Sequence, residues 1–556
     1  MYSCDCECSV SQLPVNKCSE KTSNEFDYIV IGAGSAGAII AKELSDDLYN
    51  TVLLLEQGNY DVNNPVILDT SSIKDNLRLV NTFNTITTLT NDPLTLSNHH
   101  VIVGQTTGGS SAHNYFLATR ASPNYHNQLG TEFGGAWDYF NALKIYKKLE
   151  DYNGKLTDNR AVGGPIGIFQ NPTSISPFTL SFLPLLANST ATNIELDYNN
   201  GYNNVISNAI QRFQHRDRTL SFTGRDFLGS QVLTKSNNNL IGVGNRKLYL
   251  INNTFVKKVI FDDVKAKGVE VIVDGQCQTF LANKKIILSA GAINSPLILI
   301  RSGIGPQLVL HNLHIKPYSV NSSVGSHMQF HYGPVMIIEG SKNALSDSHL
   351  VALLSSQNNG KRDLEIVISS QIPNTDNFSS SIRDISQTSP NVLYVLIRLL
   401  KAKSFGTIQP ASIEPHSQVV INFKPYSDPS DLTLARQAVN VVKTSLDALN
   451  TQLGKSEYVI RYPPSTAFDK NKQDDLDNYI KVSTSIANHY ASSVPIGKSD
   501  RDGAVDPSLN VYNTRGLMVA DLSVLPIPDA DSGLTAMYIG KRAVQILQTP
   551  THSSYC

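Results

Sequence analysis

Short, uninterrupted apolar runs mark the start of the folded part of the chain. Residues 27–31 (DYIVI) and 51–55 (TVLLL) are rich in aliphatic and β-branched side chains. This composition is typical of strands that a parallel sheet buries on both faces. Residues 38–44 (AIIAKEL), which lie between the two runs, have the composition of a helix. The pattern predicts a strand–helix–strand unit that begins near residue 26.

Three glycines and one acid occupy the turns of this unit. The first run is followed by GAGSAG, residues 32–37, and the second by Glu56. In a dinucleotide-binding fingerprint, Gly32 makes the tight turn, Gly34 lets a pyrophosphate approach the backbone, and Gly37 lets the helix pack on the strand. Glu56 is placed to accept hydrogen bonds from ribose hydroxyls and to disfavour a 2′-phosphate. The unit therefore predicts a dinucleotide site, without deciding between FAD and NAD.

Three later segments have similar strand-and-turn patterns. Residues 108–111 (GGSS) predict a tight turn whose N–H groups face a flat cofactor or its phosphates. Residues 286–306 predict a strand, a glycine turn and a helix that starts near Ser295 and Pro296. Residues 516–521 predict a strand that ends in an acid, followed by a helix over residues 535–547.

Taken in order, these segments resemble the motifs of the glucose–methanol–choline (GMC) family of FAD-dependent oxidoreductases. The resemblance extends over residues 26–547 and rests on LLEQG (54–58), GGSSAHN (108–114), GAINSPLILIRSGIG (291–305), DPSL (506–509) and VADLSVLP (519–526). It implies FAD as the cofactor. It also implies an α/β fold, in which a Rossmann-like FAD-binding domain is interleaved with an α+β substrate domain built on an antiparallel sheet.

The domain boundaries follow from the same resemblance. We expect a Cys-rich tail over residues 1–24 that precedes both domains. The FAD-binding domain would combine residues 25–155, 215–320 and 500–556, and the substrate domain residues 156–214 and 321–499. The apolar run at 392–397 and the alternation at 419–423 agree with a sheet in the second domain.

The resemblance also implies a set of cofactor contacts. They are Gly32, Gly34, Gly37, Glu56, Gly108, Gly109, Ser110, His113, Asn114, Val256, Gly291 and Asp521. In some members, a histidine at the place of His113 is bonded covalently to the 8α-carbon of the flavin. Covalent attachment and a simple packing contact both remain open for His113.

The oxidation of an alcohol needs a base for the hydroxyl proton and an acceptor for the hydride. Residues 484–497 align with the family pattern YHPxGTCxMG through His489 and Gly497, which implies that His489 is the acid/base. Tyr490 stands where the family usually has Pro, and Ser492 and Ser493 replace its Gly-Thr pair. Some hydroxynitrile lyases of the family also have His-Tyr at this point.

The second catalytic position of the family is not found by counting. The family places a His or Asn about seven residues before the glycine that matches Gly540, and this count reaches Gly533. Residues 529–533 contain neither residue type, so Asp531 is the candidate at this position. A carboxylate beside the flavin would oppose hydride uptake, and we therefore expect weakened turnover. His331 lies in a segment similar to the family's VGxNLxDH, but the departures there leave its role open.

Composition narrows the classes of partner. The chain has 46 Lys and Arg residues against 47 Asp and Glu, a net charge of −1, which argues against strong electrostatic capture of nucleic acid or an anionic membrane. We expect a small neutral alcohol substrate, no membrane partner, no metal site, and a homo-oligomer that could form a higher assembly. The chain contains no apolar run long enough to span a membrane and does not begin like a signal peptide, and its location stays open.

The cysteines are unevenly distributed. Cys4, Cys6, Cys8 and Cys18 lie in the first eighteen residues, and only Cys277 and Cys556 follow. We expect a flexible or cross-linking tail and a folded body that does not depend on disulfides.

Two other functions stay open at this stage. One is a structural or assembly protein of GMC fold that binds FAD but turns over little, such as a virion component that contacts nucleic acid collectively. Three features favour this alternative: the missing second catalytic residue, the tail cysteines and the Asn-rich composition. An Asn-rich composition is compatible with a large DNA virus. The other is hydroxynitrile lyase chemistry.

Overall fold

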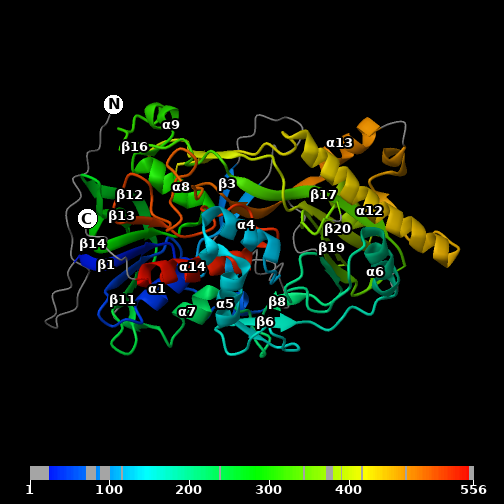
Figure 1. Cartoon of the computed structure of the whole chain (residues 1–556), viewed down its shortest axis with the longest axis horizontal. Coiled ribbons are helices and arrows are strands. Elements are labelled where there is room, and N and C mark those ends of the chain that lie inside the picture. Colours follow the sequence, from blue (N-terminus) through cyan, green and yellow to red (C-terminus); the bar gives the residue numbers. More distant parts are fainter. Residues whose placement is uncertain are drawn as a thin grey trace.

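The structure is a computed structural model of the whole chain. It describes residues 24–69, 83–87, 100–113, 117–236, 239–341, 345–357, 359–370, 380–389, 391–414, 417–469 and 473–549. Two large sheets organise it, and Figure 1 shows one of them at each end of the long axis. Each sheet has its own large cluster of buried apolar side chains. The predicted fold class, a Rossmann-like domain interleaved with a domain built on an antiparallel sheet, is confirmed.

The first sheet has nine strands, and its centre is parallel. β1 pairs in parallel with β2 and β14, β11 pairs with β2, and β25, from near the C-terminus, pairs with β14. The strands are β1 (Glu25–Ile31), β2 (Val52–Leu55), β9 (Leu233–Ser236), β10 (Asn239–Gly242), β11 (Leu248–Ile251), β12 (Thr254–Asp262), β13 (Lys265–Val273), β14 (Gln276–Leu288) and β25 (Leu517–Val519). The apolar runs at residues 27–31 and 51–55 are therefore buried parallel strands, as predicted.

Helices from both ends of the chain pack together beside this sheet. α1 (Gly37–Leu44) contacts α7 (Thr223–Leu228) and α14 (Ser532–Gln548), and the blue α1 and red α14 lie side by side in Figure 1. A Cβ atom at Gly540 would lie 2.8 Å from the backbone oxygen of Ala36. Glycine at this position therefore brings the last helix onto the first glycine turn.

The helix after β14 starts earlier than the sequence predicted. α8 spans Gly291–Arg301, so it begins at the glycine turn, and Pro296 lies inside it. Proline has no N–H for the carbonyl of Ala292, four residues earlier. The hydroxyl of Ser493 donates to that carbonyl instead, at 2.6 Å. A contact from a distant segment thus lets the helix continue through the proline.

The second sheet has seven strands, and all its ladders are antiparallel. Its strands are β7 (Val205–Ser207), β17 (Gln329–Glu339), β18 (His349–Leu354), β19 (Leu364–Ser369), β20 (Val392–Leu399), β23 (Val459–Tyr462) and β24 (Thr484–Ala491). The helices at this end are α6 (Pro177–Thr190), α11 (Ser380–Thr388), α12 (Pro429–Leu453) and α13 (Gln473–Ser483). α12 packs on α6 and on β17 and β20, and α13 packs on β17.

Smaller elements complete the fold. The strands are β3 (Phe83–Thr87), β4 (His100–Gly104), β5 (Glu150–Tyr152), β6 (Ile166–Gln170), β8 (Gln211–Phe213), β15 (Ile304–Gly305), β16 (Ser319–Val320), β21 (Thr407–Pro410) and β22 (Val419–Asn422). The helices are α2 (Pro65–Leu68), η1 (Gly109–Ala112), α4 (Pro123–Phe133), η2 (Gly135–Trp137), α5 (Tyr139–Leu149), α9 (Gln307–Asn312) and η3 (Ser465–Phe468).

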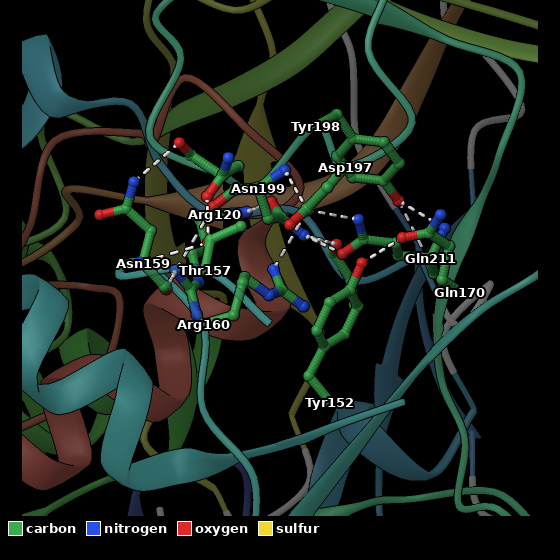
Figure 2. Close-up of polar contacts among 12 residues, drawn as sticks. Arg120, Tyr152, Thr157, Asn159, Arg160, Gln170, Asp197, Tyr198, Asn199 and Gln211 are labelled. Carbon is green, nitrogen blue, oxygen red and sulfur yellow. Dashed lines mark hydrogen bonds and ion pairs between the residues drawn. The ribbon is translucent and has the colours of Figure 1, made fainter. Parts of the chain in front are cut away.

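A buried network of charged and polar side chains holds three connecting segments together (Figure 2). Arg120 and Arg160 both pair with Glu150, at 2.6 Å and 3.4 Å, and Arg160 also pairs with Asp197 at 3.5 Å. The guanidinium of Arg160 lies 3.5 Å from the centre of the Tyr152 ring. The side chain of Arg160 is fully buried, and this burial lowers the pKa of its guanidinium even though both carboxylates lie close to it.

One of the six cysteines lies within the described residues. Cys277, in β14, is disulfide-bonded. This bond adds a covalent link to a folded body that we expect not to depend on disulfides for its stability. The other five cysteines lie outside the described residues.

No helix in the described part of the chain is both long enough and apolar enough to cross a membrane.

Candidate active site

One cavity is lined by residues from both sheets. Gly32, Gly34 and Glu56, from the first strand–helix–strand unit, line one part of it. His489 and Arg398, from strands of the second sheet, line another part, together with Asp531 at the start of α14. The structure thus brings the predicted dinucleotide residues and the predicted catalytic residues to the same cavity.

Two glycine turns meet at the cavity and leave no room for side chains. A Cβ atom at Gly37 would lie 1.9 Å from the backbone oxygen of Gly32, and one at Gly109 would lie 2.8 Å from the Cα of Gly34. Gly32, Gly108 and Gly109 all have positive φ, at 97°, 103° and 54°, which glycine adopts without strain. Both turns therefore depend on glycine for their shape and their contact.

The two predicted acidic residues are fixed by backbone groups. The carboxylate of Glu56 accepts hydrogen bonds from the N–H groups of Ala33 and Gly58, both at 2.8 Å, and burial raises its pKa to about 7. The carboxylate of Asp521 accepts from the N–H of Gly291 at 2.9 Å and the hydroxyl of Ser295 at 2.5 Å. Burial also raises the pKa of Asp521. Both carboxylates line the cavity in fixed orientations.

The remaining cavity wall fits an extended dinucleotide. Ala36, the N-cap of α1, and Asp531, the N-cap of α14, make no side-chain capping hydrogen bond, and both residues line the cavity. N–H groups at helix starts favour phosphate or other anionic groups. A Cβ atom at Gly291 would meet no atom within 4 Å, so the wall there stays open to a ligand. Val256, at the start of β12, lines the cavity beside Glu56.

The GGSSAHN segment lies partly in the same wall. Gly109, Ser110 and His113 line the cavity, whereas Gly108 is the N-cap of η1 behind it. Burial lowers the pKa of His113 to about 4, which keeps its imidazole neutral at physiological pH. Asn114 lies outside the described residues.

A bulge in β24 places the candidate base. In the ladder between β24 and β17, Tyr490 pairs with Phe330 and Ile486 pairs with Tyr332. The three residues 487–489 therefore lie opposite one residue, His331. Bulges of this kind redirect a side chain out of the regular alternation of a strand, and here the bulge includes His489.

His331 and His489 form a pair whose protons can be assigned. The Nδ1 atoms of the two rings are 3.0 Å apart, and Nε2 of His331 lies 2.9 Å from the carbonyl oxygen of Pro528. A carbonyl only accepts, so Nε2 of His331 carries its proton and Nδ1 of the neutral ring accepts. Nδ1 of His489 must then be the donor. This leaves Nε2 of His489 without a proton and able to accept one.

The electrostatic surroundings keep this pair neutral. Burial, together with the positive charge of Arg398, holds the pKa of His489 well below its ordinary value. The pKa of His331 is lowered by burial, by His489 and by Arg398. Nε2 of His489 lies 3.5 Å from a carboxylate oxygen of Asp531, which acts in the opposite direction but does not overcome the desolvation of the ring.

Asp531, the candidate for the second catalytic position, has partners for both of its carboxylate oxygens. Its Oδ1 atom accepts a hydrogen bond from Nη1 of Arg398 at 2.8 Å, and its Oδ2 atom accepts one from the hydroxyl of Thr119 at 3.2 Å. Nη1 of Arg398 also donates to Glu365 at 2.7 Å. Burial and Asp531 together raise the pKa of Glu365 to about 7. Nη1 of Arg398 thus pairs with both carboxylates, so that Asp531 lines the cavity as one member of an ion pair.

Sequence reasoning missed the partners of His489. A second histidine is present at the site, but it comes from β17 rather than from the segment before Gly540. Arg398 in β20 and Glu365 in β19 lie directly opposite each other in the ladder between these two strands. The sequence did contain a signal for this pair. Each of the mostly apolar strands VLYVLIRL and LEIVIS includes one charged residue, and a buried charge requires a partner.

Comparisons with known proteins identify the family of the chain. A GMC oxidoreductase N-terminal model matches residues 26–332, and a GMC oxidoreductase C-terminal model matches residues 402–540. The chain is 25% identical over 568 residues to a GMC oxidoreductase family protein of Malassezia sympodialis, covering 90% of this chain and 89% of that protein. It is 24% identical over 548 residues to choline oxidase of Arthrobacter globiformis, covering 95% of each. The crystal structure of pyridoxine 4-oxidase from Mesorbium loti superimposes with a TM-score of 0.78 at 20% identity, covering 94% of this chain and 98% of that one.

Proposed function

The chain belongs to the GMC oxidoreductase family of FAD-dependent enzymes, and on that premise we propose that it oxidises a small neutral alcohol to a carbonyl compound. The observation that carries the proposal is the chain of contacts from the carbonyl of Pro528 through His331 to His489, which assigns an unprotonated Nε2 to His489. His489 lines the cavity, and a carboxylate oxygen of Asp531 lies 3.5 Å from its Nε2 atom. A base in this state is what the removal of a hydroxyl proton requires.

The cofactor is FAD, and the glycine turns and Glu56 would hold its dinucleotide part. When bound, FAD supplies the hydride acceptor. Nε2 of His489 takes the hydroxyl proton of the alcohol, and the ring becomes an imidazolium. Asp531 stabilises that charge through its carboxylate, while Arg398 keeps Asp531 in place. The low pKa of His489 means that the ring returns the proton readily after the reaction.

The charges at the site support a neutral substrate. Arg398 is paired with Asp531 and Glu365, and both histidines are neutral by burial. An ionic substrate would therefore find no cavity-lining charge among these groups that is not already paired. The net charge of the whole chain, −1, agrees with the same substrate class.

The alternative of an assembly protein with little turnover is less well supported. It rested mainly on the missing second catalytic residue, and His331 now lies beside His489. None of the relatives named above is a virion component, so a virion role has no support from them.

The test is anaerobic reduction of the bound flavin by a panel of aryl and aliphatic alcohols. We expect the oxidised absorbance to bleach with at least one alcohol, and the His489→Gln variant to bleach at least about 100-fold more slowly, since general base catalysis contributes that much. His327→Gln is the matched control, because His327 is exposed and stacks on Phe405 away from the pair. If no alcohol bleaches a flavin that light can still reduce, the proposal fails. Cyanide release from mandelonitrile without bleaching would identify a lyase instead.

We further propose that His113 is bonded to the flavin. A half-buried, neutral imidazole in the cavity wall supports this, because only the neutral ring is nucleophilic. After denaturation in acid or SDS, the yellow colour should remain with the protein. It should leave with the solvent in the His113→Ala variant. Release of all colour from the unmodified protein would show that the bond is absent.

A further inference from the structure

The bulge beside the candidate base contains a residue in the left-handed region. Asn488 has φ of 56°, in the middle of β24 and directly before His489. Outside glycine, asparagine is among the few residue types that adopt this conformation routinely. The local backbone thus limits the residue types that position 488 can accept without strain.

The side chain of Asn488 also makes two hydrogen bonds. Its Oδ1 atom accepts from the hydroxyl of Tyr490 at 2.7 Å and from the backbone N–H of Ile102 at 3.2 Å. Tyr490 is buried and stacks on Phe423, with ring centroids 6.0 Å apart. One oxygen thus ties the bulge to a packed aromatic ring on one side and to β4 on the other.

β4 continues from this contact to the second glycine turn. The strand ends at Gly104, whose N–H donates to the hydroxyl of Ser110 at 3.1 Å. A Cβ atom at Gly104 would lie 2.3 Å from the carbonyl carbon of Gly109. Only one residue, Val103, therefore separates Ile102, which Asn488 contacts, from Gly104, which packs closely against the turn that lines the cavity.

We propose that Asn488 is a positioning residue that fixes His489 relative to the cofactor turn at residues 108–111. The proposal rests on the role of His489 proposed above. It accounts for both properties of the position, since the backbone needs a residue that tolerates positive φ and the link to β4 needs an acceptor. Tyr490 stands where the family usually has Pro. Its hydroxyl donates a hydrogen bond to Oδ1 of Asn488, so Tyr490 contributes to the same positioning.

Three substitutions separate the two properties. Asn488→Gly keeps the backbone conformation and removes the acceptor, Asn488→Ala removes both, and Asn488→Asp keeps both but adds a charge. Asn245→Gly is the matched control, because Asn245 has φ of 62° on an exposed turn between β10 and β11.

We expect Asn488→Gly to keep its FAD content and melting temperature and to reduce the flavin about 10- to 100-fold more slowly, since small displacements of a reacting group cost that much. The loss should fall on kcat rather than on KM. Asn488→Ala should lose at least as much rate. Asn488→Asp should recover most of the rate, with its pH midpoint shifted upward, because a new carboxylate near His489 adds to Asp531 and opposes Arg398. Asn245→Gly should behave like the unmodified protein.

Two readouts do not depend on turnover. Hydrogen exchange of the Ile102 amide should be faster in Asn488→Gly, because the amide loses its acceptor, and the ¹⁵N shifts of the His489 ring should change. If the rate, the exchange and the shifts all stay at the unmodified values in Asn488→Gly, the proposal is overturned. If no alcohol reduces even the unmodified protein, the proposed function fails, and the exchange and the shifts still decide for or against the positioning role.

Discussion

At the scale of single residues, one backbone carbonyl determines the chemistry of the His331–His489 pair. Pro528 accepts from His331, and this fixes the proton on each ring in turn. Replacing His331 with Phe removes the acceptor for Nδ1 of His489, so that the proton is free to move to Nε2. We expect flavin reduction to slow by about 100-fold. His331→Asn, whose amide can accept at the same place, should recover most of the rate.

The measurement is the rate of anaerobic flavin reduction together with ¹⁵N spectra of the histidine rings. In the unmodified protein, Nε2 of His489 should have the shift of an unprotonated ring nitrogen. A protonated Nε2 at neutral pH would contradict the assignment, and so would equal rates for His331→Phe and His331→Asn.

The charge of Arg398 should be visible in the pH profile. Burial and Arg398 hold the pKa of His489 below 6.5, and a base acts only above its pKa. The rate of flavin reduction should therefore be constant near neutral pH and fall as the pH drops through a midpoint below 6.5. Arg398→Met removes the cation and leaves Asp531, so the midpoint should rise by about one pH unit, whereas Arg398→Lys should hold it low. A midpoint that stays in place in Arg398→Met would contradict the assignment.

At the scale of elements, α8 shows how a distant hydroxyl completes a helix. Ser493 donates to the carbonyl of Ala292, which Pro296 leaves without an N–H partner. Both Ser493 and Ala292 are buried. Ser493→Ala should lower the free energy of unfolding by about 1–3 kcal/mol, the cost of a buried unpaired carbonyl.

A double-mutant cycle tests this directly. With alanine at position 296, the helix regains its own N–H for Ala292, and Ser493→Ala should then cost much less. The measurement is thermal or denaturant unfolding of the two single variants and the double variant. An equal cost of Ser493→Ala in both backgrounds would show that the hydroxyl does not substitute for the missing helical bond.

At the scale of the whole molecule, the network in Figure 2 connects segments that the sequence assigned to different domains. Arg160 lies between Glu150 and Asp197 and over the ring of Tyr152. Arg160→Met should lower the free energy of unfolding by about 1–3 kcal/mol, because Asp197 loses its ion pair with Arg160 while Glu150 keeps Arg120 as a cation. Arg160→Lys should recover little, since an ammonium group lacks the planar fork that reaches both acids and the ring.

The check is thermal unfolding followed by flavin fluorescence and by far-UV circular dichroism. The two signals should shift together to lower temperature in Arg160→Met, because the network joins segments near the cofactor cavity to the rest of the fold. An Arg160→Lys variant as stable as the unmodified protein would contradict the bidentate role.

The first strand–helix–strand unit and its glycine turn were determined by the sequence itself. Their information is local: a run of buried side chains, a glycine where a Cβ would lie 1.9 Å from a carbonyl, and an acid at the end of a strand. The later motifs, including the segment that contains His489, could be found in the sequence because each of them is also a local pattern. The start of α8 was not, because proline ends most helices and only a contact with Ser493 lets this one continue.

Only the tertiary structure decided which groups act on His489. His331 is 158 residues away from it in sequence, and Arg398 is 133 residues away from Asp531. Which side chains meet across strands depends on the register of the ladder, and here a bulge of three residues against one sets that register. Neighbouring residues do not encode such a shift, because it results from the packing of β24, β17 and β4 together. The sequence thus contained the cofactor fold and the candidate base, and the fold supplied the histidine, arginine and carboxylate that surround that candidate.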